Sequence, residues 1–121
     1  MGWSEDPHGA VLLVKQTRGR KYWTLPGGKV FANESVEAGL KREIFEETGA
    51  RVIFASQMAV FDRPPKRSLT FLYRVALRTN GNWKWNPHEI AQVDYHARLP
   101  REASPSLRHF WNLLRPRAQS F

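Results

Sequence analysis

The chain has 121 residues, of which 41% are hydrophobic, and its 19 Lys and Arg against 11 Asp and Glu give a net charge of +8. At this length we expect one domain, residues 1–121, and the composition excludes both a disordered chain and a membrane span, which needs about 20 consecutive apolar residues. The absence of cysteine excludes disulfides, thiolate nucleophiles and cysteine-ligated metals, and together with an N-terminus unlike a secretory signal it favours a cytoplasmic location.

The first third of the chain predicts two strands separated by a turn. Gly9–Lys15 is a run of Val and Leu that is typical of a buried strand. The polar segment Gln16–Lys21 follows as a turn. A short aromatic strand then leads to Pro26-Gly27-Gly28, where the backbone is expected to turn sharply or to approach another group closely.

The segment after this turn predicts a helix with a clear start and end. Ser35 is a suitable N-cap, and Gly49 is placed to end the helix. Between them Val36, Leu40 and Ile44 recur every four residues and form an apolar stripe.

The second half of the chain predicts further strands and a last helix. Arg51–Asp62 and Ser68–Arg78 have the composition of strands, and the prolines of Arg63–Arg67 place a loop between them. A short strand is expected around Gln92–His96. An amphipathic C-terminal helix is predicted last, with Ser104 or Ser106 near its cap. The chain is therefore α+β or α/β, with a mixed sheet and at least two helices.

Three glutamates, Glu43, Glu46 and Glu47, fall on one face of the first predicted helix. The first and last form a like-charge pair four residues apart, and two of them lie in the last turn, where the helix dipole disfavours carboxylates. Such a conflict with local electrostatics is typical of functional sites. Three carboxylates near a backbone carbonyl of the glycine turn suit a hard cation such as Mg²⁺ or Mn²⁺. A solvated acidic helix face is the alternative.

The spacing of these residues resembles the signature of the Nudix hydrolase family, MutT-like proteins included. That signature is G-x5-E-x7-R-E-U-x-E-E-x-G-U, where U is a bulky aliphatic residue. It is met by Gly28, Glu34, Arg42-Glu43-Ile44, Glu46-Glu47 and Gly49, and Ala50 at the last position is the one departure. The flanking WTLPGGKV and the order of elements are also similar to the family. The resemblance implies a Nudix-type α/β/α sandwich with a mixed sheet, a loop–helix–loop and a C-terminal helix.

The resemblance also implies a role for each matching residue. Glu43, Glu46 and Glu47 correspond to the metal-binding glutamates, and Gly27 corresponds to the donor of a backbone carbonyl. Glu34 and Arg42 correspond to an ion pair that braces the loop against the helix, and an Arg among four carboxylates is placed to neutralise one and to orient the others.

The sequence also offers candidates for the general base and for substrate binding. Glu47 is the first candidate for the base, Asp94 or Glu89 the second, and His96 a further one. The candidates for gripping the phosphates of the substrate form a basic loop: Arg63, Lys66 and Arg67. The candidates for stacking on a base are aromatic: Trp23, Tyr22, Phe61 and Tyr73. Aromatic residues in strands more often belong to the core.

The resemblance implies a hydrolase that uses Mg²⁺ or Mn²⁺ to cleave a nucleoside diphosphate linked to another moiety. The substrate could be a nucleoside triphosphate, a nucleotide sugar, ADP-ribose or a dinucleoside polyphosphate, and the basic surface would attract such anions. The alternatives are an enzyme acting on the 5′ end of RNA, which the net charge favours, and a sensor that binds a nucleotide without turnover. A homodimer is a further expectation, and a membrane partner is not expected.

Overall fold

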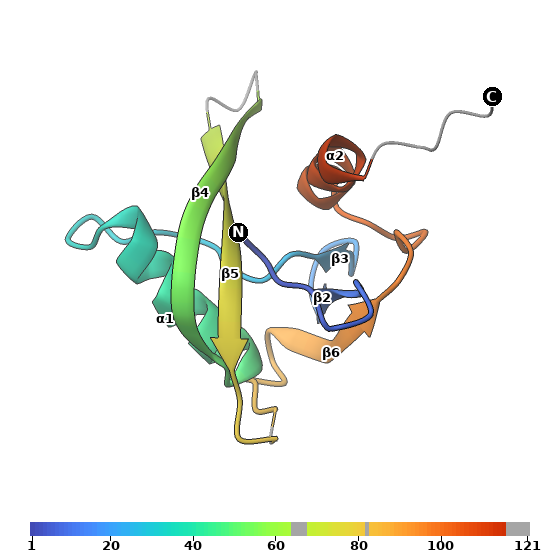
Figure 1. Ribbon diagram of the computed structural model, residues 1–121, viewed down its shortest axis with the longest axis horizontal. Coiled ribbons are helices and arrows are strands. Elements are labelled where there is room, and N and C mark those ends of the chain that lie inside the picture. Colours follow the sequence, from blue (N-terminus) through green and yellow to red (C-terminus); the bar gives the residue numbers. More distant parts are fainter. Residues whose placement is uncertain (64–67, 82, 116–121) are drawn as a thin grey trace.

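The computed structural model describes residues 1–63, 68–81 and 83–115, and it excludes the side chains of Arg63 and Ser68. The chain builds two small sheets that face each other, with helix α1 on the outer face of one and helix α2 beside the gap between them (Figure 1). Within the described residues, no helix is long and apolar enough to cross a membrane.

The first sheet is mixed and has the strand order β1-β5-β4. Strand β1 (Gly2–Trp3) pairs in parallel with β5 (Ser68–Arg78), and β5 pairs antiparallel with β4 (Arg51–Arg63). The β4–β5 register shifts after Val52 and again after Gln57, which marks two bulges in β4.

The second sheet is antiparallel and has the order β3-β2-β6. Its central strand β2 (Val11–Gln16) is buried at four successive positions, as expected for a strand covered on both faces. Strand β3 (Trp23–Thr24) leads into the glycine turn, and β6 (Ile90–His96) forms the other edge.

Helix α1 (Val36–Thr48) begins and ends at the predicted caps. The Ser35 hydroxyl accepts a hydrogen bond from the amide of Ala38, and Gly49 adopts a left-handed conformation with φ of 80°. The apolar side of α1, with Leu40 and Ile44, packs on β5. The fit is close, because a Cβ on Gly2 would lie 2.7 Å from Cδ1 of Ile44.

Helix α2 (Pro105–Leu114) closes the main core between the two sheets. Ser104 caps its first turn, and the side chains of Leu107, Phe110 and Trp111 are buried. They pack with Trp3 of β1, whose ring centroid lies 5.5 Å from that of Trp111.

The predicted fold class, mixed α and β with two helices, is confirmed. The elements differ from prediction in several respects. Arg63, expected in the loop, is the last residue of β4, because it pairs with Ser68 of β5. The strand expected around Gln92–His96 begins earlier, at Ile90, and β1 was not anticipated. The strands also divide into two sheets of three, because β2 pairs with β3 and β6 and not with β5.

Candidate active site

The C-terminal half of α1 carries the three glutamates together with Arg42. Their positions follow from the seating of the helix, because burial of Leu40 and Ile44 turns the opposite side towards the loop of residues 27–34 and towards solvent. The last turn of α1 contains no basic residue. The glutamates therefore depend on a cation outside that turn for neutralisation.

Arg42 is the centre of a group of carboxylates. Its Nη1 lies 3.1 Å from Glu43 Oε1 and 3.1 Å from Glu46 Oε2, and its Nη2 lies 2.8 Å from Glu34 Oε1. The same Nη2 donates to the carbonyl oxygen of Lys29 at 2.8 Å. Hydrogen bonding to Glu34 raises the pKa of Arg42 and lowers the pKa of Glu34. The expected Glu34–Arg42 ion pair is thus present and ties the loop to the helix.

The loop before α1 and the helix itself approach each other closely at glycines of both segments. Gly27 has φ of 104°, and a Cβ on it would lie 3.0 Å from Cδ1 of Leu40. A Cβ on Gly28 would lie 3.4 Å from Oε2 of Glu43, and one on Gly39 would lie 3.0 Å from Oε1 of Glu34. The glycines therefore allow backbone and carboxylates to come together.

Glu47 is directed towards the glycine turn and accepts a hydrogen bond of 2.6 Å from the amide of Gly27. Burial raises the pKa of Glu47 to about 7, against the lowering effect of the Gly27 bond, and the charges of Glu43 and Glu89 raise the pKa further. Several carboxylates therefore crowd a partly buried space in which one of them resists ionisation.

The donor set fits a hard divalent cation, although the side chains are not arranged around one. Among residues 1–63, 68–81 and 83–115, no three Asp, Glu, His or Cys side chains form a group that could hold a metal ion as they stand. Glu43 and Glu46 contact Arg42, and Glu47 contacts Gly27. A cation would have to draw these oxygens away from Arg42 and the Gly27 amide.

The structure separates the two carboxylates offered as a second base. Glu89 lies just before β6, and its charge acts on Glu47. Asp94 lies within β6, and its charge acts on His96 instead. His96 itself packs edge-on against Trp23 with ring centroids 4.3 Å apart, and burial lowers its pKa. Of the two carboxylates, only Glu89 is electrostatically coupled to the glutamate cluster.

The aromatic candidates for stacking on a base are mostly packed within the protein. Trp23 is 9% exposed and belongs to the main core with residues of α2, and its role as a substrate contact stays a prediction. Tyr73 is 9% exposed, and its hydroxyl lies 3.4 Å from Gln57. Phe61 stacks on His109 with ring centroids 4.1 Å apart, and Tyr22 is half-buried.

Lys66 and Arg67 lie outside the described residues, and Arg63 is described only by its backbone at the end of β4.

One neighbour of the cluster was missed by sequence reasoning. The ring of Phe31 lies over the Arg42 guanidinium, with 3.9 Å from Cζ to the ring centroid, and the amide of Phe31 donates to Glu34 Oε1 at 2.8 Å. Phe31 is 54% exposed, and this exposure is given by the structure alone, so no signal in the sequence singled the residue out.

Comparison with known proteins agrees with the fold and the motif. The NUDIX domain family matches residues 3–111. The chain therefore belongs to the Nudix family. The structure of a MutT NUDIX hydrolase from Burkholderia pseudomallei superposes with a TM-score of 0.77 and 27% identity, covering 89% of this chain and 91% of that one.

Relatives with named activities match over shorter stretches. An 8-oxo-dGTP diphosphatase of Buchnera aphidicola (strain APS) is 28% identical over 87 residues, 70% of this chain and 66% of the relative. A Bacillus subtilis (strain 168) protein provisionally named 8-oxo-dGTP diphosphatase is 43% identical over 54 residues, 45% of this chain and 36% of the relative. Diphosphoinositol polyphosphate phosphohydrolase 2 of Rattus norvegicus is 30% identical over 63 residues, 52% of this chain and 35% of the relative. These last two matches span only about a third of each relative.

Proposed function

We propose that the chain hydrolyses the pyrophosphate bond of a nucleoside diphosphate joined to another group, with Mg²⁺ or Mn²⁺ as cofactor. The observation that carries the proposal is the group of carboxylates around Arg42, with Glu47 bonded to Gly27, in the segment that matches the Nudix signature. Family membership and the names of the relatives as diphosphatases support the reaction class.

In this proposal Glu43, Glu46, Glu47 and the carbonyl of Gly27 hold the metal. All are hard oxygen donors of the kind that Mg²⁺ prefers. When bound, the metal neutralises the diphosphate, polarises a phosphorus–oxygen bond and lowers the pKa of a bound water. The crowding of Glu43, Glu47 and Glu89 supports a cation, because its charge would relieve their mutual repulsion.

The remaining residues orient the site and accept the proton. Arg42 and Glu34 hold the loop and set the direction of the neighbouring carboxylates. Glu47 or Glu89 takes the proton from the attacking water, and coupling to the cluster favours Glu89 over Asp94 as the alternative to Glu47.

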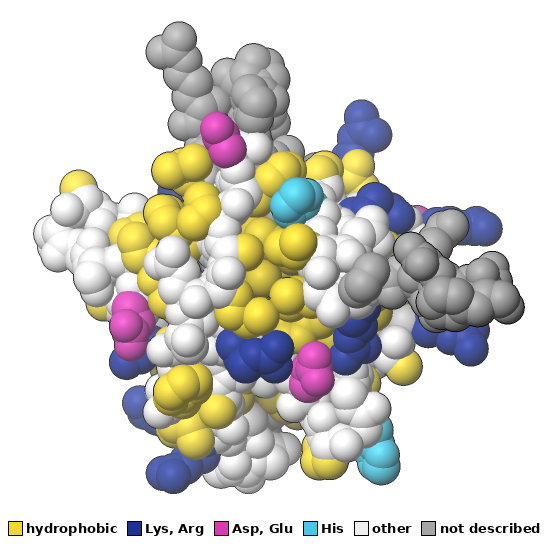
Figure 2. Space-filling view, turned by 45° about the horizontal axis from the view of Figure 1, so that its top comes forward, with side chains coloured by type: hydrophobic (Ala, Val, Ile, Leu, Met, Phe, Trp, Pro, Cys, Tyr) yellow, Lys and Arg dark blue, Asp and Glu magenta, His cyan; other side chains and the backbone are white. Residues whose placement is uncertain are grey.

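The substrate we propose is a small nucleotide, with a nucleoside triphosphate first because relatives are named as 8-oxo-dGTP diphosphatases. Nucleotide sugars, ADP-ribose and dinucleoside polyphosphates belong to the same proposed class. The net charge of +8 supports an anionic substrate, and the face shown in Figure 2 carries more Lys and Arg side chains than Asp and Glu. The same charge favours the 5′ end of RNA as the second candidate. A homodimer, a single domain over residues 1–121 and a cytoplasmic location stay predictions.

The test is turnover of a nucleotide panel with Mg²⁺ or Mn²⁺. The panel contains the triphosphates with 8-oxo-dGTP, ADP-ribose, nucleotide sugars, dinucleoside polyphosphates and a 5′-triphosphorylated RNA, and phosphate or pyrophosphate release is measured. We expect metal-dependent turnover that Glu46→Gln abolishes. Glu37→Gln is the matched control, because Glu37 lies in the first turn of the same helix and, among the residues that the structure describes, pairs with Lys41 alone at 3.3 Å. Nucleotide binding without turnover of any compound would instead establish a sensor.

A further inference from the structure

The C-terminal end of α1 opens into a cavity of about 400 Å³ on the side of the helix that carries Phe45. Its lining includes three cations and two neutral hydrogen-bonding side chains: Arg51, Arg78, Lys84, Thr79 and Asn80. Among the described residues, none of the three cations forms an ion pair, and no carboxylate lines the cavity. The volume is in the range of small-molecule sites.

Two of the cations are placed directly against each other. Arg51 of β4 and Arg78 of β5 are cross-strand partners in the antiparallel register. Like charges at directly opposed positions destabilise a sheet, and both side chains are exposed to solvent. The Arg51 guanidinium lies over the Phe45 ring, 5.0 Å from Cζ to the centroid, and this contact keeps it beside the cavity.

The helix end alone does not account for this charge. The C-terminus of a helix carries a partial charge of about −0.5, which one nearby cation more than offsets. Three cations leave a surplus of about 2.5 positive charges. A structure that concentrates like charge against local electrostatics indicates a function for that charge.

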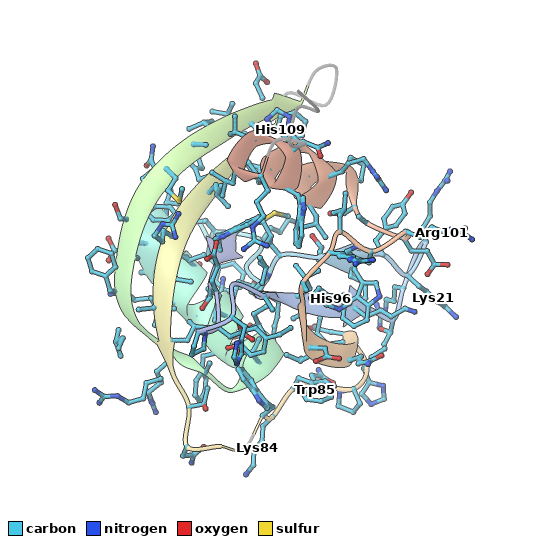
Figure 3. The ribbon with its side chains drawn as sticks, turned by 45° about the vertical axis from the view of Figure 1, so that its right-hand side comes forward. Lys21, Lys84, Trp85, His96, Arg101 and His109 are labelled. Carbon is cyan, nitrogen blue, oxygen red and sulfur yellow. The ribbon has the colours of Figure 1, made fainter. Side chains whose placement is uncertain are left out.

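Lys84 is held at this place by backbone contacts. Its amide donates to the carbonyl oxygen of Thr48 at 3.0 Å, and its backbone lies so close to Gly49 that a Cβ there would be 2.8 Å from the Lys84 nitrogen. Figure 3 shows Lys84 and Trp85 at the end of the molecule where β5 finishes. The cavity is therefore built from α1, β4, β5 and the segment after β5, and its cations come from three separate segments.

We propose that this cavity binds phosphate groups, as a second anion site separate from the glutamate cluster. Two guanidinium groups, an ammonium, a hydroxyl and an amide supply donors suited to phosphate oxygens. The phosphate comes either from a nucleic-acid backbone or from a small polyphosphate. The site does not depend on the proposed hydrolase activity, because none of its residues belongs to the metal or carboxylate group.

The experiment measures binding in EDTA, so that the proposed metal site does not hold phosphate. One arm titrates tripolyphosphate while backbone amide signals are followed by NMR, and the other titrates a labelled 5′-hydroxyl single-stranded RNA of about 12 nucleotides over a range of salt concentrations. The test variant combines Arg51→Gln, Arg78→Gln and Lys84→Gln. The control removes the same charge elsewhere through Arg20→Gln, Arg98→Gln and Arg101→Gln.

We expect tripolyphosphate or RNA to shift the amide signals of Thr79, Asn80 and Lys84, and the test variant to lose these shifts. With RNA, the slope of log K against log salt should fall by about 2 in the test variant, because each phosphate contact on a single strand contributes about 0.7. The arm that shows the loss identifies the source of the phosphate. Equal losses in both triple variants, or no shift at these amides with either probe, would overturn the site.

Discussion

Arg42 holds Glu34 through two hydrogen bonds, one of 3.1 Å from Nε to Oε2 and one of 2.8 Å from Nη2 to Oε1. The two residues are eight positions apart and belong to different segments, so this contact fixes the loop on the helix. Because the other guanidinium nitrogen reaches Glu43 and Glu46, the direction of these carboxylates depends on the same group.

This arrangement predicts that Arg42→Lys keeps the charge but loses the function. A lysine ammonium cannot make the paired contact to Glu34 and reach the carbonyl of Lys29 at once. We expect about 10- to 100-fold lower activity or metal affinity, with folding retained in circular dichroism. Lys41→Gln, which removes a neighbouring exposed charge, is the control. A lysine variant as active as the native protein would show that the paired geometry is irrelevant.

Gly27 is expected to resist substitution more than Gly19, although both have positive φ. An alanine there would adopt φ of 104° and place its Cβ 3.0 Å from Leu40, whereas Gly19 has φ of 63° and nothing within 4 Å of a Cβ. We expect Gly27→Ala to lower the free energy of unfolding by about 2–4 kcal/mol and Gly19→Ala by about 1 kcal/mol. Urea denaturation measures both, and equal losses would contradict the packing argument.

The elements that sequence reasoning found are those determined by local contacts. Helix α1 begins at Ser35 and ends at Gly49 through hydrogen bonds within the helix itself. The residue types at these two positions were therefore enough to predict its bounds. Strand β1 is different, because Gly2 and Trp3 become a strand only by pairing with Tyr73 and Arg74. A two-residue strand of this kind has no periodicity from which it could be predicted.

The same distinction applies to the site. The ion pair between Glu34 and Arg42 was predicted because the resemblance to the Nudix signature implies it, and the structure contains it. The burial of Trp23 could not be predicted in this way, because it depends on α2, which is far along the chain. The charge of Glu89, and not that of Asp94, acts on Glu47 because of where β6 begins relative to Glu47. The spacing of residues in the sequence does not determine this position.

Phe31 is predicted to position Arg42. Its ring covers the guanidinium and its amide supports Glu34, so loss of the ring should free the side chain that orients the carboxylates. We expect Phe31→Ala to lower kcat several-fold with little change in KM, since a cation–π contact at an exposed site contributes about 0.5–1 kcal/mol. Phe31→Tyr should retain activity. The control is Leu113→Ala, which removes a similarly exposed apolar side chain on α2. A Phe31→Ala variant as active as this control would exclude the positioning role.

Glu47 is predicted to destabilise the metal-free protein at neutral pH. Burial raises its pKa from 4.5 to about 7, so the folded state binds the proton more tightly than the unfolded state does. The free energy of unfolding should therefore fall as the pH rises from about 4.5 to 7, by an amount on the order of 3 kcal/mol. Glu47→Gln keeps an acceptor for the Gly27 amide and removes the titration.

The comparison is made by urea denaturation in EDTA at pH 5 and pH 8. Glu47→Gln should be more stable than the native protein at pH 8 and similar to it at pH 5. Glu37→Gln, on the exposed first turn, should have the stability of the native protein at both pH values. Added Mg²⁺ should stabilise the native protein at pH 8 and stabilise Glu47→Gln less, because a cation compensates the carboxylate that burial disfavours. A Gln variant that is no more stable than the native protein at pH 8 would show that Glu47 ionises without cost and that its burial places no strain on the site.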